Sequence, residues 1–191
     1  MKVFREIVIT VLIAVAVFAL LRLTVQSYTV VMSSMEPNFQ QGDCIMVNKV
    51  CYRSSDPKRG QVIIFQPPFD SPHPYIKRVI GLPGESVEIK DGQVFINGIP
   101  IDEPYIFPEP PQNNKDYGPK ALADDEYFVL GDNRNNSNDS RSGWTVPRDN
   151  IVGRAWFIYW PPGGWGIVKH YSYEVDERVM RVGQTLGVQR E

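Results

Sequence analysis

The sequence predicts an all-β domain of antiparallel sheets that follows one N-terminal transmembrane helix. An apolar run lies near the N-terminus, and after Tyr28 short β-branched or aromatic segments alternate with Gly, Pro, Asn and Asp, with almost no helical periodicity. A chain of 191 residues suffices for one ordinary domain and an appendage, whereas two full domains would be crowded. We expect an anchor over residues 1–27, a β-rich domain over 28–170 and a fraying tail over 171–191.

The apolar run extends from Ile7 to Leu21 and is interrupted only by Thr10. Counted through Val25, it would measure roughly 28 Å at about 1.5 Å per residue, close to the hydrocarbon thickness of a bilayer, if Arg22 snorkels to the interface. A cleaved signal peptide is the alternative. The run is long for such a segment and no small-x-small cleavage site follows it, which favours an uncleaved anchor.

Basic residues beside the apolar run set its expected orientation. Lys2, Arg5 and the free amino terminus precede it, so the positive-inside rule places the N-terminal end in the cytoplasm, although Arg22 weakens the asymmetry. The remainder of the chain then lies outside the cytoplasm, where disulfides can form.

The cysteines, Cys44 and Cys51, belong to one strand candidate, CIMVNKVCY. A continuous strand would point them to opposite faces and separate them by roughly 23 Å, whereas a disulfide needs Cα atoms within about 7 Å. We therefore expect two free thiols. Because the chain has only these two cysteines and two histidines, His73 and His170, we also expect no zinc site, and nothing in the sequence calls for a cofactor.

Several stretches of the domain have the composition of strands. They cover residues 44–50, 61–65, 75–82, 86–101, 126–131 and 154–160. The dipeptides Asp91-Gly92 and Asn97-Gly98 are typical of tight turns and predict a three-stranded meander over 86–101.

Two further stretches are less regular. The proline-rich residues 104–125 predict an irregular excursion, so that meander and excursion together occupy about 86–125. Residues 156–168 predict a core strand that ends in a turn. The alternative for this stretch is that Trp160 or Trp165 rests at a membrane interface, where indoles are favoured.

The charge pattern argues against a nucleic-acid partner. The formal net charge is −2, and the 20 basic and 22 acidic residues are scattered without a polybasic face. A neutral partner such as a peptide fits this pattern better.

Three short stretches could carry chemistry. In VMSSMEPNF, either Ser33 or Ser34 could be a nucleophile, or a serine could simply cap a helical turn. In YIKRVIGLPGE, strand alternation places Lys77 and Arg78 on opposite faces among apolar neighbours. Burial would lower the pKa of a lysine and make its neutral amine a general base, whereas an edge-strand lysine would snorkel to water. GDNRNNSNDSRSGW predicts a rigid loop held by ion pairs and side-chain-to-backbone bonds.

Five stretches in this order, SSMEP, GDCIMVNK, RGQVIIF, YIKRVIGLPGE and GDNRNNSNDSR, resemble the motifs of bacterial type I signal peptidases. Each motif is weak alone, and their order behind one anchor is specific. The resemblance implies an endopeptidase of the bacterial cytoplasmic membrane, with signal peptides of exported preproteins as its partners. It implies that Ser34 is the nucleophile, Lys77 its general base and Ser137 the group that orients the lysine amine. The implied bracing residues are Arg78, Asp132, Arg134, Asp139 and Arg141. We expect Asp132 to be the acidic partner that offsets the charge of Arg78.

The resemblance also implies how a substrate binds. An extended peptide would add as a strand beside YTVVM and PHPYI, and small residues such as alanine would be favoured one and three positions before the cut. The implied lining of the shallow apolar pockets is Val31, Met35, Phe39, Tyr75 and Ile76.

Two positions depart from the family pattern. The backbone N–H of Ser34 is the expected first donor to the oxyanion, and many members supply the second from a serine two residues earlier. That position is Met32, which has no donor, so Ser33 would have to turn inward. Asn38 stands where threonine usually follows the proline, and we expect it to be tolerated.

Three alternatives remain open from the sequence. A self-cleaving repressor shares the β scaffold and the Ser-Lys chemistry, but it needs a DNA-binding domain where this chain has its apolar run. An inactive membrane-tethered β domain would hold exported peptides without cutting them. A histidine triad could be built on Ser34 and His170.

Overall fold

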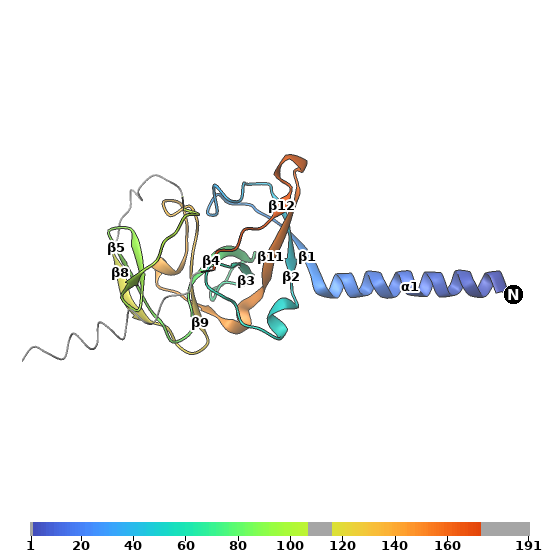
Figure 1. The fold of residues 1–191 in the computed structure, drawn as a ribbon, viewed down its shortest axis with the longest axis horizontal. Helices are drawn as coiled ribbons and strands as arrows, with labels where there is room; N and C mark the ends of the chain where they lie inside the picture. Colours follow the sequence, from blue (N-terminus) through green and yellow to red (C-terminus); the bar gives the residue numbers. More distant parts are fainter. Residues whose placement is uncertain (1, 107–115, 173–191) are drawn as a thin grey trace, which may run out of the picture.

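One α-helix in the described part of the chain, α1 (Lys2–Thr24), projects as a straight rod from a body built of strands (Figure 1). The computed structural model describes residues 2–106 and 116–172. None of the residues of α1 is buried, and the helix is long and apolar enough to cross a bilayer. No other described residue covers this apolar surface, which fits the predicted membrane anchor.

The larger sheet is antiparallel throughout and contains the strands that later carry the site. Its order is β1-β2-β11-β3-β4-β9-β10, and β12 pairs with β11. The strands are β1 (Val25–Thr29), β2 (Cys44–Asn48), β3 (Val62–Phe65), β4 (Tyr75–Gly81), β9 (Glu126–Leu130), β10 (Val146–Pro147), β11 (Ile151–Trp160) and β12 (Gly166–Ile167). The predicted strand segments and the all-β class are thus confirmed.

The smaller sheet has the order β7-β6-β5-β8 and lies at the end of the body far from α1 (Figure 1). Its strands are β5 (Ser86–Lys90), β6 (Gln93–Ile96), β7 (Ile99–Pro100) and β8 (Tyr117–Ala121). Asp91 and Asn97 have φ of 49° and 52°, and each is followed by a glycine that also has positive φ. This geometry is that of type I′ turns, so the predicted meander is confirmed.

Strand β8 lies in the stretch that we expected to be irregular, and for Tyr117–Ala121 that prediction is wrong. The strand covers the free edge of β5. Pro119 has no N–H to donate, and the register shifts at this point of the ladder, between Val87 and Ile89 of β5. The rest of the predicted excursion at 107–115 and the tail at 173–191 lie outside the described residues.

Within residues 2–106 and 116–172, four short 3₁₀ turns join the strands: η1 (Cys51–Arg53), η2 (Ser140–Ser142), η3 (Arg148–Asn150) and η4 (Pro162–Gly164). The strand expected over 44–50 ends at Asn48, whose side-chain oxygen accepts the N–H groups of Val50 and Cys51 and turns the chain into η1. Cys44 and Cys51 are free thiols, as predicted. The expected strand and turn over 156–168 are confirmed by β11, η4 and β12.

Strand β4 is central to the packing. It lies between β3 and β9, and its residues join all three hydrophobic clusters of the body, Ile80 in one, Val79 in another and Ile76 at the margin of the third. Lys77 and Arg78, between these anchors, are each only 1% exposed. Both charges are therefore buried, one on each face, as the alternation of the strand predicts.

Candidate active site

Ser34 lies on a tight turn that follows β1, residues 32–39, which we call the serine turn. The carbonyl of Ser33 accepts the N–H of Glu36 at 3.1 Å, and the carbonyl of Met35 accepts the N–H of Phe39 at 3.0 Å. The side chains of Met35 and Phe39 are buried at 0% and 2% exposure and fix the turn in the core. The position of the Ser34 hydroxyl is therefore set by the rigid turn around it.

The Ser34 hydroxyl meets the amine of Lys77. The distance from Nζ to Oγ is 2.7 Å, and the amine also donates to the carbonyl of Ile76 at 3.0 Å. Ser34 is 4% exposed and Lys77 1% exposed, so the pair is shielded from water. The Ser34 hydroxyl is thus hydrogen-bonded to the lysine amine and does not cap a helix.

Burial lowers the pKa of Lys77 to about 8. The carboxylates of Asp139 and Asp132 favour the ammonium and oppose this shift, while the charge of Arg141 adds to it. A substantial fraction of the lysine is therefore neutral at mildly alkaline pH. A neutral amine at hydrogen-bond distance from a serine hydroxyl can accept its proton.

The side chain of Arg78 leaves β4 on the face opposite to that of Lys77. Its Nε and Nη2 donate to the two carboxylate oxygens of Asp132 at 2.8 and 2.6 Å, and its Nη1 donates to the carbonyl of Gly60 at 2.8 Å. Arg78 and Asp132 are 1% and 0% exposed. The partner predicted for Arg78 is thus confirmed, and the bidentate pair neutralises both charges.

The loop after β9 packs against the serine turn. The N–H of Asn133 donates to the carbonyl of Ser34 at 3.1 Å. Asp139 accepts the N–H of Gly131 at 3.1 Å and pairs with Arg141 at 2.8 and 2.9 Å. A side chain at Gly131 would place its Cβ only 2.4 Å from the carbonyl oxygen of Ser34, so the close approach of loop and turn requires glycine here.

Ser137 lies beside Gly131, with a buried hydroxyl. Among the described residues no hydrogen bond of ordinary geometry reaches this hydroxyl, and the amine of Lys77 is bonded instead to Ser34 and Ile76. The orienting role implied for Ser137 therefore stays a prediction.

A cleft of about 450 Å³ opens beside the Ser34–Lys77 pair. Val31, Tyr75 and Ile76 belong to its wall, as implied by the resemblance. Met35 and Phe39 do not belong to it, because both side chains point into the hydrophobic core behind the serine. The lining residues are Ser27, Tyr28, Thr29, Val30, Val31, Met32, Ser34, Ile45, Ile64, Ser71, His73, Pro74, Tyr75, Ile76 and Lys77.

Ser33 does not replace the missing oxyanion donor in this arrangement. Its hydroxyl accepts the side-chain amide of Asn136 at 2.9 Å, and Ser33 is not part of the cleft wall. Met32 is 48% exposed and lies in that wall. The inward turn that the sequence would require of Ser33 is therefore not seen.

The imidazole of His170 is hydrogen-bonded to the backbone of β3 and not to Ser34. Its Nδ1 accepts the N–H of Val62 at 3.3 Å, and burial together with the charges of Arg154 and Arg78 lowers its pKa to about 4. The hydroxyl of Ser34 meets Lys77 and not this imidazole. The geometry therefore favours the dyad over a histidine triad.

Sequence reasoning missed two residues that brace the site. Glu103 forms a buried bidentate pair with Arg134, but nothing in its local sequence marks it. Asn38 was noted only as a departure from the family pattern. Its amide donates to Asp132 at 2.9 Å and to the carbonyl of Tyr105 at 2.7 Å, so it links the serine turn to the partner of Arg78.

Comparison with known proteins finds similarity to one family of peptidases. The family model described as "Signal peptidase, peptidase S26" matches residues 3–160. The probable signal peptidase I-2 of Synechocystis sp. (strain ATCC 27184 / PCC 6803 / Kazusa) is 44% identical over 134 residues, which are 68% of this chain and 60% of that protein. The signal peptidase I T of Bacillus subtilis (strain 168) is 38% identical over 165 residues, which are 82% of this chain and 83% of that protein.

A solved structure is also similar. The crystal structure of a signal peptidase I from Enterococcus faecalis V583 is 32% identical, with a TM-score of 0.47, and the match covers 52% of this chain and 97% of that chain. Among the relatives, the match covers between 60% and 83% of the length of the two proteins named above.

Proposed function

This chain belongs to the signal peptidase family, peptidase S26, and from that premise we propose that it is a serine endopeptidase that removes signal peptides from exported preproteins. The observation that carries the proposal is the buried contact of 2.7 Å between the amine of Lys77 and the hydroxyl of Ser34. An inactive peptide-binding domain would have no use for a desolvated lysine at this position.

The reaction follows from the chemistry of the pair. Neutral Lys77 accepts the proton of the Ser34 hydroxyl as Oγ attacks the scissile carbonyl, and the backbone N–H of Ser34 donates to the developing oxyanion. The resulting ammonium returns the proton to the leaving amine, which leaves an acyl group on Ser34. Lys77 then takes a proton from water, the hydroxide equivalent attacks the ester, and Ser34 is released with its proton restored.

The substrate is proposed to bind as an added strand in the cleft. Its walls come from the β1 end and the start of β4, which present backbone groups along an extended path. Val31, Tyr75 and Ile76 would contact the substrate side chains before the cut. Larger side chains there would overpack a shallow wall, whereas alanine would fit.

The proposed site lies at the surface of the bacterial cytoplasmic membrane, with the N-terminus in the cytoplasm and the β-rich body outside. Helix α1 passes into β1 without a linker, and the N–H of Lys49 on the β2 side donates to the carbonyl of Thr24 at 2.9 Å. The cleft wall therefore begins directly after the anchor. Trp160 and Trp165 are 55% and 64% exposed and are proposed to rest at the membrane interface.

The test is cleavage of a purified preprotein by membranes that contain the full chain. The expected products are the mature protein and its signal peptide, cut after a small-x-small sequence, which N-terminal sequencing of the mature product identifies. Membranes without the chain are the control. An uncut preprotein, or a cut at unrelated positions, would contradict the proposed function.

A chain that lacks residues 1–24 should keep its activity on short soluble peptides but lose efficiency on membrane-embedded preproteins. The truncation retains β1 and its pairing with β2, so the site itself should be intact. The anchor confines enzyme and substrate to the same membrane, and losing it should reduce the rate on embedded substrates by about 10²-fold. The measurement is kcat/KM on both substrate types. Equal efficiency of the full and truncated chains on embedded preprotein would refute this role of α1.

A further inference from the structure

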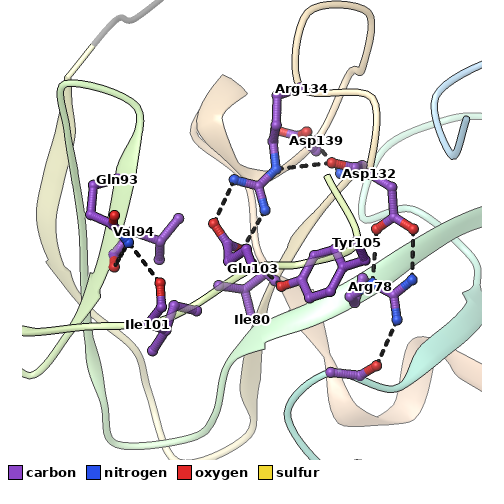
Figure 2. A network of polar contacts seen from close by, with 12 residues as sticks. Arg78, Ile80, Gln93, Val94, Ile101, Glu103, Tyr105, Asp132, Arg134 and Asp139 are labelled. Carbon is purple, nitrogen blue, oxygen red and sulfur yellow. Dashed lines mark hydrogen bonds and ion pairs between the residues drawn. The ribbon is translucent and has the colours of Figure 1, made fainter. Parts of the chain in front are cut away.

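A short segment that follows β7, residues 101–106, carries Glu103 and Tyr105, whose side chains lie beside Arg134 and Arg78 (Figure 2). It is fixed to the smaller sheet at its start. The N–H of Ile101 donates to the carbonyl of Val94 at 3.0 Å, and the amide of Gln93 donates to the carbonyl of Ile101 at 2.6 Å. The side chain of Ile101 is buried in the cluster that joins the sheets. The start of the segment is therefore held in place by the smaller sheet.

Glu103 connects this segment to the loop after β9. Its carboxylate takes both terminal nitrogens of Arg134, one of them at 2.9 Å. The side chains are 4% and 6% exposed, so the pair is shielded from water. Arg134 in turn donates from Nε to the carbonyl of Gly131 at 3.1 Å. An ideal Cβ at Gly131 would lie 2.4 Å from the carbonyl oxygen of Ser34, and two residues later the N–H of Asn133 donates to that carbonyl at 3.1 Å. The buried carboxylate of Glu103 is thus linked through Arg134 to the loop that contacts the serine turn.

Tyr105 connects the same segment to the other parts of the site. Its hydroxyl donates to Glu103 at 2.7 Å, and its ring lies 4.2 Å from the guanidinium carbon of Arg78, next to the catalytic lysine in β4. Its carbonyl accepts the amide of Asn38, on the serine turn, at 2.7 Å. The serine turn, β4 and the loop after β9 thus all contact residues 103–105. Figure 2 shows Arg78 and Arg134 beside this segment.

We propose that Glu103 is a positioning residue of this active site: through Arg134 it holds the loop after β9 against the serine turn and so fixes the approach of Ser34 to Lys77. The proposal rests on the proposed function. The cleft is lined by residues 27–32 and Ser34, by Ile45 and Ile64 and by residues of the 71–77 stretch, and residues 101–106 are absent from its lining. Glu103 should therefore influence kcat and leave KM almost unchanged.

The deciding variant is Glu103→Gln, which keeps the shape of the side chain and removes its charge. It leaves the buried guanidinium of Arg134 without its counter-charge, so the loop should shift away from its present place. A displacement of about 1 Å at the reacting groups can cost about 10²-fold in rate. We expect kcat per folded molecule to fall by about 10- to 100-fold and KM to stay within about twofold.

The fold offers a matched control in Glu85→Gln. Glu85 also forms a bidentate pair with an arginine, Arg59, with side-chain exposures of 17% and 5%. Its other contact is the N–H of Leu82 at 2.7 Å, and Arg59 reaches the carbonyl of Ile80, so this pair braces the β4–β5 connection instead of the catalytic loop. Glu85→Gln should lower the melting temperature to a similar degree as Glu103→Gln and keep kcat per folded molecule within about twofold of the wild type.

Equal losses of kcat in the two glutamine variants, or a Glu103→Gln effect confined to KM, would overturn the proposal and leave Glu103 a purely structural residue. If Glu103→Gln does not fold, Glu103→Asp decides, because it keeps the charge on a shorter side chain. Its kcat should be reduced at unchanged KM, and a wild-type kcat would contradict the positioning role. Failure of the wild-type chain to cut a preprotein would instead refute the proposed function, so the two failures are distinguishable.

Discussion

Replacement of Ser34 by alanine should reduce preprotein cleavage to the background of membranes without the enzyme. The loss in kcat should be about 10⁴-fold or more, because no other group can form the acyl intermediate. The fold should survive, since the serine turn is held by backbone bonds and by the buried side chains of Met35 and Phe39, all of which remain. Cleavage assays combined with thermal unfolding of the same preparations measure both points.

Ser33→Ala is the matched control for this result. It removes an adjacent hydroxyl that accepts a hydrogen bond from the exposed side-chain amide of Asn136. The rate should therefore change by no more than about threefold. A loss as deep as that of Ser34→Ala would mean that the nucleophile was wrongly assigned or that Ser33 supplies the missing oxyanion donor during the reaction.

Replacement of Lys77 by methionine should be nearly as damaging as the loss of the serine. Methionine preserves most of the volume of the buried lysine stem, which limits the cavity, but it cannot accept a proton. The serine hydroxyl then has no base, and we expect kcat to fall by about 10³-fold or more at unchanged KM. Single-turnover acylation of Ser34, followed by mass spectrometry, measures the step directly.

His170→Ala is the control for the lysine variant. His170 accepts a backbone N–H in the larger sheet and has no place in the Ser34–Lys77 contact, so its loss should lower stability and leave kcat per folded molecule almost unchanged. A lysine variant that keeps its rate while His170→Ala is inactive would replace the dyad by a histidine mechanism.

The sequence was informative wherever a local pattern sufficed. Alternation in β4 placed Lys77 and Arg78 on opposite faces, and the Asp-Gly and Asn-Gly dipeptides placed both turns of the meander. The pairing of Arg78 with Asp132 was also predicted, because opposite charges in buried positions require one another.

Features that depend on distant contacts were missed. Glu103 lies 31 residues before Arg134 in an unremarkable stretch, and only the packing of the smaller sheet on the larger one brings them together. Strand β8 forms because the edge of β5 is available, in spite of a glycine and a proline that argue against a strand. Met35 and Phe39 follow the serine closely in sequence, but the turn directs both into the core and away from the cleft.

If Lys77 is a neutral base, the pH dependence of kcat/KM on a short peptide should report the pKa of its amine. The active form is the unprotonated amine, so activity should rise with pH. Because burial lowers the pKa of Lys77 to about 8, kcat/KM of the wild type should rise about tenfold per pH unit on the acid side and level off above pH 8 to 9. A rising limb centred near the ordinary lysine value of 10.5 would show that the amine is not desolvated in the working enzyme and would contradict the mechanism.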